Sequence, residues 1–104
     1  MKLKKGVNSA GIRPELLLAL VVADGVWQQV GQELVVTSLN DSRHSRTSLH
    51  YAGCAADLRT HYFTDAQATE VAAALRESLG DSPDYDIVFE SDHIHIEWQP
   101  KRRG

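Results

Sequence analysis

Residues 85–98 read YDIVFESDHIHIEW, and this stretch predicts two strands, Tyr85–Phe89 and His93–Trp98, separated by only a few residues. Successive side chains of a strand point to opposite faces, so the second strand has one apolar and one polar face. The apolar side chains point into the core; they are Ile94, Ile96 and Trp98. The polar face carries His93, His95 and Glu97. Two imidazoles and a carboxylate on one strand face are less ordinary than a merely polar face.

Two helices are predicted before these strands. Residues 14–30 form the first, which begins with a proline and an acidic residue, is apolar almost all round in its first half and therefore buried, and ends at Gly31. The second begins at Thr64, which forms a capping box with Gln67, and it ends at Gly80. Its apolar face comprises Ala68, Val71, Ala72, Leu75 and Leu79.

Two shorter segments, Glu33–Ser38 and Cys54–Arg59, are predicted as further strands, and residues 1–12 as an extended lead-in. The chain contains no internal repeat, low-complexity tract or linker. A length of 104 residues fits one compact core. We therefore predict one α+β domain over residues 1–104, with an antiparallel sheet and two main helices.

Composition limits the possible functions. A net charge of -3 gives no electrostatic reason to expect a nucleic-acid partner. A single cysteine, Cys54, excludes an internal disulfide framework and a thiolate-rich zinc site, and we interpret it as a small core residue. Any metal must therefore bind through nitrogen and oxygen, and the chain has five histidines to supply them. Trp27 and Trp98 are also interpreted as core residues.

The apolar run Leu16–Ala23 is much shorter than the roughly 20 residues that span a bilayer, so we expect no transmembrane segment. Lysines precede this run, as in a signal peptide, but the Pro14-Glu15 pair before it favours the start of a helix. We therefore expect no export signal and synthesis in the cytoplasm.

A second group of unusual residues lies in the segment SLHYAGCAAD at 48–57. His50 and Asp57 would be about 10 Å apart along a continuous helix, too far for bonds of about 2 Å to one ion. The segment must fold back if both bind the same metal, and Gly53 permits such a reversal. Together with His93 or His95 they would supply three ligands, the pattern of a catalytic zinc that keeps its fourth position for water.

A nearby carboxylate must then accept the proton of the water, and both Glu90 and Asp92 are candidates. In a regular strand Asp92 would face away from His95. The chain must therefore bend at Ser91-Asp92 for Asp92 to reach the metal.

The motif Ser48-x-His50-x-x-Gly53-x-Ala55-x-Asp57, followed by Asp92-His93-x-His95, resembles the M15 family of zinc peptidases. This family comprises D-Ala-D-Ala carboxypeptidases and L-Ala-D-Glu endopeptidases, phage endolysins among them, and the Hedgehog signalling domain is related to it. The resemblance runs from about residue 12 to residue 100 and implies the Hedgehog/DD-peptidase fold.

The resemblance also implies roles for individual residues. The zinc ligands would be His50, Asp57 and His95. Asp92 would be the catalytic base, and His93 would assist substrate or oxyanion binding from the same strand face. Ser48 would support the ligand loop.

The sequence departs from the family at the substrate-binding arginine. Carboxypeptidase members often carry it in a Ser-Gly-Tyr-Arg-type stretch, which here reads TSLND at 37–41. Arg43 or Arg46 would substitute, and His44 would line the site. Arg59 is either an exposed sheet residue or a substrate contact, and His61 is expected to take no part in catalysis. The departure favours cleavage within the stem peptide over removal of a terminal residue.

The expected function is hydrolysis of an amide bond in peptidoglycan stem peptides by a monomeric zinc enzyme, as an endopeptidase or a D,D-carboxypeptidase. It would act on the bacterial cell wall after release by a phage or prophage. The alternative is a non-catalytic binding module of Hedgehog type, in which zinc only stabilises the fold.

Overall fold

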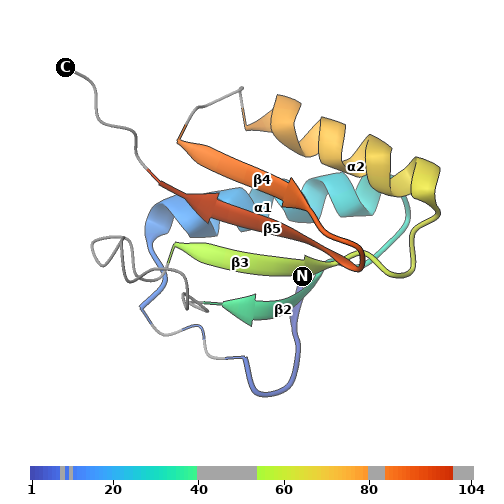
Figure 1. Cartoon of the computed structure of the whole chain (residues 1–104). Coiled ribbons are helices and arrows are strands. Elements are labelled where there is room, and N and C mark those ends of the chain that lie inside the picture. The colour runs from blue at the N-terminus through green and yellow to red at the C-terminus, as the bar shows by residue number, and fades with distance from the viewer. Residues whose placement is uncertain (8, 10, 40–53, 80–83, 100–104) are drawn as a thin grey trace.

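The computed structural model describes residues 1–7, 9, 11–39, 54–79 and 84–99. It has two layers, a sheet of five strands and two helices that cover one face of that sheet (Figure 1). We call the other face of the sheet the outer face. In chain order the elements are β1 (Lys2–Leu3), α1 (Pro14–Gln29), β2 (Val35–Leu39), β3 (Ala55–Arg59), α2 (Asp65–Ser78), β4 (Tyr85–Phe89) and β5 (His93–Trp98). The strand order is β1-β2-β3-β5-β4, so the expected α+β class with two main helices is confirmed.

The expectation of an antiparallel sheet needs one correction, because β1 pairs with β2 in parallel while the other three pairings are antiparallel. The backbone N–H of Lys2 donates to the carbonyl of Leu34 over 2.8 Å, and that of Lys4 donates to Val36 over 2.9 Å. The two residues of β1 lie in a lysine-rich start whose apolar alternation, Met1 and Leu3, is too short to predict a strand. The sheet is therefore mixed.

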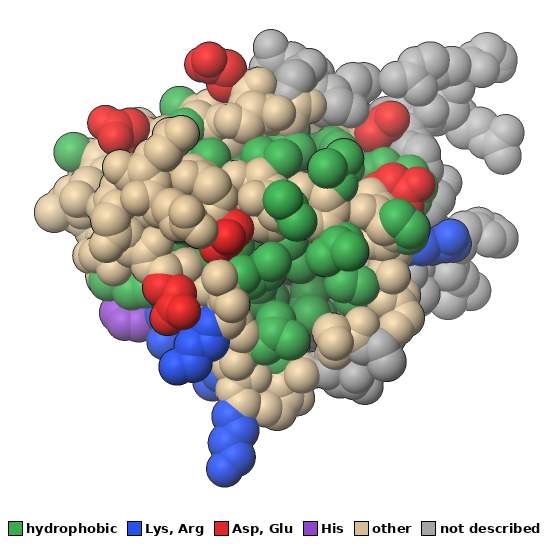
Figure 2. Space-filling model, turned by 180° about the vertical axis from the view of Figure 1, so that it is seen from behind, with side chains coloured by type: hydrophobic (Ala, Val, Ile, Leu, Met, Phe, Trp, Pro, Cys, Tyr) green, Lys and Arg blue, Asp and Glu red, His purple; other side chains and the backbone are tan. Residues whose placement is uncertain are grey.

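Helix α1 matches the predicted helix, with Pro14 at its first turn and Gly31 after its end at a φ of 77°. The expectation that its first half is buried all round is wrong. Leu17, Leu18 and Val21 are 47%, 57% and 56% exposed, and Figure 2 shows apolar side chains gathered on the helix side of the molecule. In a two-layer fold the sheet covers only one side of a helix, which leaves the other side to solvent.

Helix α2 has the predicted capping box. The backbone N–H of Gln67 donates to Thr64 Oγ1 over 3.1 Å, and the backbone N–H of Thr64 donates to Gln67 Oε1 over 3.0 Å. The helix ends at Ser78, while the predicted stop, Gly80, lies outside the described residues. Four of its apolar residues are buried against the sheet: Ala68, Val71, Ala72 and Leu75.

The core lies between the helices and the sheet. Trp27 is fully buried, as expected, and its indole N–H donates to Tyr62 Oη over 3.1 Å. Cys54 is also buried, and burial raises the pKa of its thiol. Trp98 is only half-buried, because it ends β5, although Ile94 and Ile96 of the same face are fully buried. No helix in the described part of the chain is long and apolar enough to cross a membrane.

Candidate functional site

The register of β3 and β5 brings four polar side chains together on the outer face. Asp57 lies directly opposite His95, and Arg59 lies directly opposite His93. These pairs alternate with Leu58 and the two isoleucines of β5, which are fully buried on the helix side. The alternation that builds the core therefore also builds the site, because each buried residue forces its neighbour to the outer face.

His95 contacts two carboxylates. Its Nδ1 lies 2.8 Å from Asp57 Oδ1, and its Nε2 lies 3.1 Å from Glu97 Oε1. Only a protonated imidazole can donate from both ring nitrogens. The hydrogen bond to Asp57 is the largest cause that raises the pKa of His95 to about 9, against a smaller opposing effect of burial. In the absence of a metal His95 is therefore an imidazolium at neutral pH.

His93 lies one pair of outward-facing residues further along β3 and β5, and it also contacts Asp57. Its Nε2 lies 3.6 Å from Asp57 Oδ1, and its Nδ1 lies 2.7 Å from Asp92 Oδ1. The hydrogen bond with His93 is the main cause that lowers the pKa of Asp92, whose side chain is 74% exposed. Asp92 is therefore an ionised carboxylate that solvent and ligands can reach.

The backbone bends where the sequence required it. Strand β4 ends at Phe89 and β5 begins at His93, so residues 90–92 connect the two strands of a hairpin. The N–H of Glu90 donates to the carbonyl of His93 over 2.8 Å, and the N–H of Thr60 donates to the carbonyl of Asp92 over 3.2 Å. These two bonds fix the turn, in which the Asp92 carboxylate contacts the ring of His93. The predicted bend at Ser91-Asp92 is thus confirmed, whereas the role of Asp92 as a base stays a prediction.

The expected ligand set falls partly outside the described residues. Of the site residues that we predicted, the structure brings together Asp57, Asp92, His93 and His95. The others lie outside the described ranges; they are Arg43, His44, Arg46, Ser48 and His50. Within the described ranges no three His, Cys, Asp or Glu side chains are arranged to hold a metal ion. Because His50 is not among the residues searched, its membership of the ligand set stays a prediction.

The described part of the site nevertheless fits a metal in its donor chemistry. Two ligand atoms bound to one tetrahedral zinc at about 2.0–2.1 Å lie about 3.3 Å apart. Asp57 Oδ1 and His95 Nδ1 are 2.8 Å apart, about 0.5 Å closer than two ligands of one zinc, and His95 would have to lose its Nδ1 proton to bind the ion. A histidine that binds a metal usually donates its other ring N–H to a carboxylate, and Glu97 accepts from His95 Nε2.

Glu97 is a residue whose role the sequence analysis missed. We placed it on the histidine face without a function, although a carboxylate two residues after a histidine on one strand face is within reach of its ring. Its second oxygen, Oε2, accepts a hydrogen bond from the Gln99 amide. Glu97 is therefore held in place, and it orients His95 so that Nδ1 faces Asp57.

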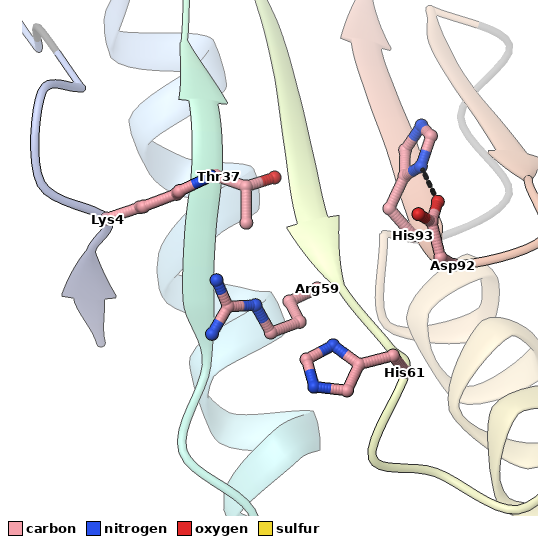
Figure 3. A pocket seen from close by; sticks show the side chains of 6 residues that line it. All are labelled: Lys4, Thr37, Arg59, His61, Asp92 and His93. Carbon is pink, nitrogen blue, oxygen red and sulfur yellow. Dashed lines mark hydrogen bonds and ion pairs between the residues drawn. The ribbon is translucent and has the colours of Figure 1, made fainter.

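A cavity of about 300 Å³ adjoins this cluster (Figure 3). Its lining residues are Lys4, Thr37, Arg59, His61, Asp92 and His93. His61, expected to take no part in the site, lies beside Arg59 in this cavity. Arg59, for which two interpretations were open, points into a cavity that Asp92 and His93 share.

No protein-family model matches this sequence, and a search of curated proteins finds no significant match. The interpretation of the site therefore rests on its geometry and on the motif.

Proposed function

We propose that this protein is a zinc-dependent peptidase that resembles the M15 family in its motif and in a Hedgehog/DD-peptidase-like fold, and that hydrolyses an amide bond in peptidoglycan stem peptides. The observation that carries the proposal is the direct opposition of Asp57 and His95 across β3 and β5, with Oδ1 and Nδ1 2.8 Å apart. These are two of the three ligands that the motif implies, and they are 38 residues apart in the sequence.

Asp57, His95 and His50 would hold the ion, with Glu97 fixing the ring of His95. When bound, zinc would supply Lewis-acid activation of a water molecule and of the scissile carbonyl. His93, whose Nε2 lies 3.6 Å from Asp57 Oδ1, is near enough to contact a substrate bound there. Both histidine side chains would thus serve the reaction from one strand face.

Asp92 would act as the base. Asp92, like any exposed carboxylate, is ionised at neutral pH and can accept a proton, and its exposure leaves it open to a substrate. The same group, once protonated, would return the proton to the leaving amine. His93 Nδ1 lies 2.7 Å from Asp92 Oδ1, and this hydrogen bond keeps the carboxylate next to the ring of His93.

The proposal is tested with defined muropeptides, whose products are identified by mass spectrometry with the protein in its zinc-loaded and chelator-treated forms. We expect cleavage of one amide bond by the zinc-loaded form alone. The mass of the products then tells an endopeptidase from a D,D-carboxypeptidase. Absence of cleavage by zinc-loaded protein would refute the proposal, and if zinc were also required for folding, it would favour the non-catalytic module.

The base is tested by replacing Asp92 with alanine. We expect Asp92→Ala to lower kcat by about 100-fold or more while zinc stays bound, because general acid–base catalysis typically contributes 10²–10⁴-fold. Glu90→Ala is the matched comparison, since it removes a carboxylate from the same turn. Full activity of Asp92→Ala with zinc bound would show that Asp92 is not the base, and loss of activity in Glu90→Ala alone would transfer the role to Glu90.

The proposed cell-wall substrate and the proposed release by a phage or prophage follow from the resemblance, and the monomer stays a prediction. The proposal includes no nucleic-acid partner.

A further inference from the structure

The cavity beside the Asp57–His95 pair is lined by two cations that the proposed reaction does not use. Lys4 follows β1 and Arg59 ends β3, and both extend over the outer face towards Thr37 of β2 (Figure 3). A second cavity, of about 430 Å³, shares these two residues and is also lined by Lys2, Lys5 and a single carboxylate, Glu33. Positive charge is therefore concentrated at this end of the sheet in a protein whose net charge is -3.

Neither cation forms an ion pair with another described residue. The ion pairs found among the described residues join histidines or the N-terminal amine to carboxylates, and none includes Lys4 or Arg59. Asp92, which lines the same cavity, is already bonded to His93. The Thr37 hydroxyl donates to the Asp57 carbonyl over 3.3 Å, so the charged donors left for a ligand are those of Lys4 and Arg59, with the ring of His61 beside them.

The net charge of the residues that line the first cavity favours one kind of anion as its ligand. Lys4 and Arg59 carry two positive charges and Asp92 carries one negative charge, which leaves one positive charge in excess, the histidines aside. A singly charged carboxylate matches this excess, whereas the second charge of a phosphate monoester would meet Asp92. The planar guanidinium of Arg59 also fits a carboxylate through two parallel hydrogen bonds.

The position of the cavity places that carboxylate near the cleaved bond. Asp57 and Arg59 lie on the same face of β3 two residues apart, a separation of about 6.7 Å in a regular strand. A peptide spans at most about 3.3–3.6 Å per residue. A ligand carboxylate on Arg59 would therefore belong to a residue within about two positions of an amide held at Asp57 and His95.

We propose that Arg59 and Lys4 form a carboxylate-recognition site that makes the enzyme select peptides with a free carboxylate beside the scissile amide. This inference rests on the proposed function. It assigns recognition to residues outside the motif, instead of to Arg43 or Arg46, and it implies slower cleavage of substrates in which that carboxyl group is amidated.

The test compares kcat/KM for two muropeptides that differ only in whether the carboxyl group flanking the cleaved amide is free or amidated. We expect the wild type to prefer the free acid by about tenfold or more, the effect of losing a charge-assisted hydrogen bond. Arg59→Gln should bring the two substrates within about twofold of each other, Lys4→Gln should reduce the preference in part, and Arg59→Lys should keep part of it. Equal rates on both substrates with the wild type would overturn the proposal.

The matched control is Arg76→Gln, which removes the same charge from α2, where the guanidinium donates to the Ile87 carbonyl. This variant should keep the full preference, and circular dichroism should show all four variants to be folded. A preference lost equally in Arg76→Gln would mean that net charge, and not this cavity, is responsible, which would also overturn the proposal.

A binding measurement separates this inference from the proposed function. The cleavage product that carries the free carboxylate and its carboxamide counterpart are each titrated into the zinc-loaded protein, and the amide resonances of Thr37 and Arg59 are followed by NMR. We expect selective binding of the acid, weakened about tenfold by Arg59→Gln. Such binding without any hydrolysis would refute the proposed function alone, whereas hydrolysis without selective binding would refute the carboxylate site alone.

Discussion

The contact between Asp57 and His95 predicts how the stability of the metal-free protein depends on pH. The pKa of His95 is raised to about 9 in the folded state, mainly by its hydrogen bond to Asp57, and it returns to about 6.5 on unfolding. Between these values the folded state binds more protons than the unfolded state. The stabilisation is therefore fully present below pH 6.5 and is lost as the pH rises towards and through 9.

The magnitude follows from the same two values. Each pH unit between them corresponds to 1.36 kcal/mol, which gives about 3 kcal/mol as an upper limit. The side chains of His95 and Asp57 are 18% and 23% exposed, and screening by water reduces the expected contribution to about 2 kcal/mol. For a domain of this size, a loss of about 2 kcal/mol corresponds to a fall in Tm of roughly 8–16 °C.

The assay is urea unfolding in the presence of a chelator, from pH 6 to pH 9, for the wild type and for His95→Gln. The difference in free energy of unfolding between the two proteins isolates the histidine, since other titrating groups are common to both. We expect this difference to shrink by about 2 kcal/mol over the range. A difference that stays constant from pH 6 to pH 9 would refute the reasoning. Asp57→Asn should remove most of the dependence, because it removes the main cause of the raised pKa.

Two further predictions follow from single contacts. Glu97→Gln should weaken zinc binding by about 10- to 100-fold, measured by competition with a chelating dye, because the carboxylate that accepts from His95 Nε2 is lost; unchanged affinity would show that Glu97 does not support the ligand. Thr64→Ala should lower the free energy of unfolding by about 1 kcal/mol in urea, because the Oγ1 that accepts from Gln67 is removed, and an effect below about 0.3 kcal/mol would show that the capping box contributes little.

Much of the fold was predictable because the decisive signals are local. The capping box at Thr64 involves residues three positions apart, and the β5 alternation repeats every two residues, so neither depends on distant parts of the chain. The pairing of β1 with β2 was not predictable, because β1 has only two residues, too few for a strand pattern to be recognised. The exposure of Leu18 was missed for a related reason, since the number of layers that cover a helix is a property of the whole fold.

The candidate site, like the fold, was predictable only where the signals are local in the sequence. The sequence indicated which residues share a strand face, and it required the bend at Ser91-Asp92, which the hairpin supplies. The motif implied that Asp57 and His95 lie close together, but their direct opposition across β3 and β5 was not predictable, because the register between strands 38 residues apart depends on how both pack against the helices. The sequence also did not predict that Lys4 and Arg59 line one cavity, because their proximity depends on the pairing of β1 with β2.

Removal of the metal should separate the enzyme from the zinc-stabilised module. A domain that needs zinc to fold has too small a core to be stable without it. Here the helices and three of the strands share one buried cluster, against which β4 packs. The proposed ion would lie on the opposite face of the sheet, where it would bridge only β3, β5 and the segment that carries His50. In addition, the imidazolium of His95 already pairs with Asp57 when no ion is bound.

We therefore expect chelator-treated protein to lose hydrolysis but to keep its circular dichroism spectrum and a cooperative thermal transition. Zinc should raise the stability only by the mass-action effect of binding, about 2.7 kcal/mol at a free concentration 100 times its Kd. Restoration of activity by added zinc is the control for irreversible damage. If the chelator instead unfolded the protein, the core would be insufficient on its own, and the ion would serve the fold as in the non-catalytic module.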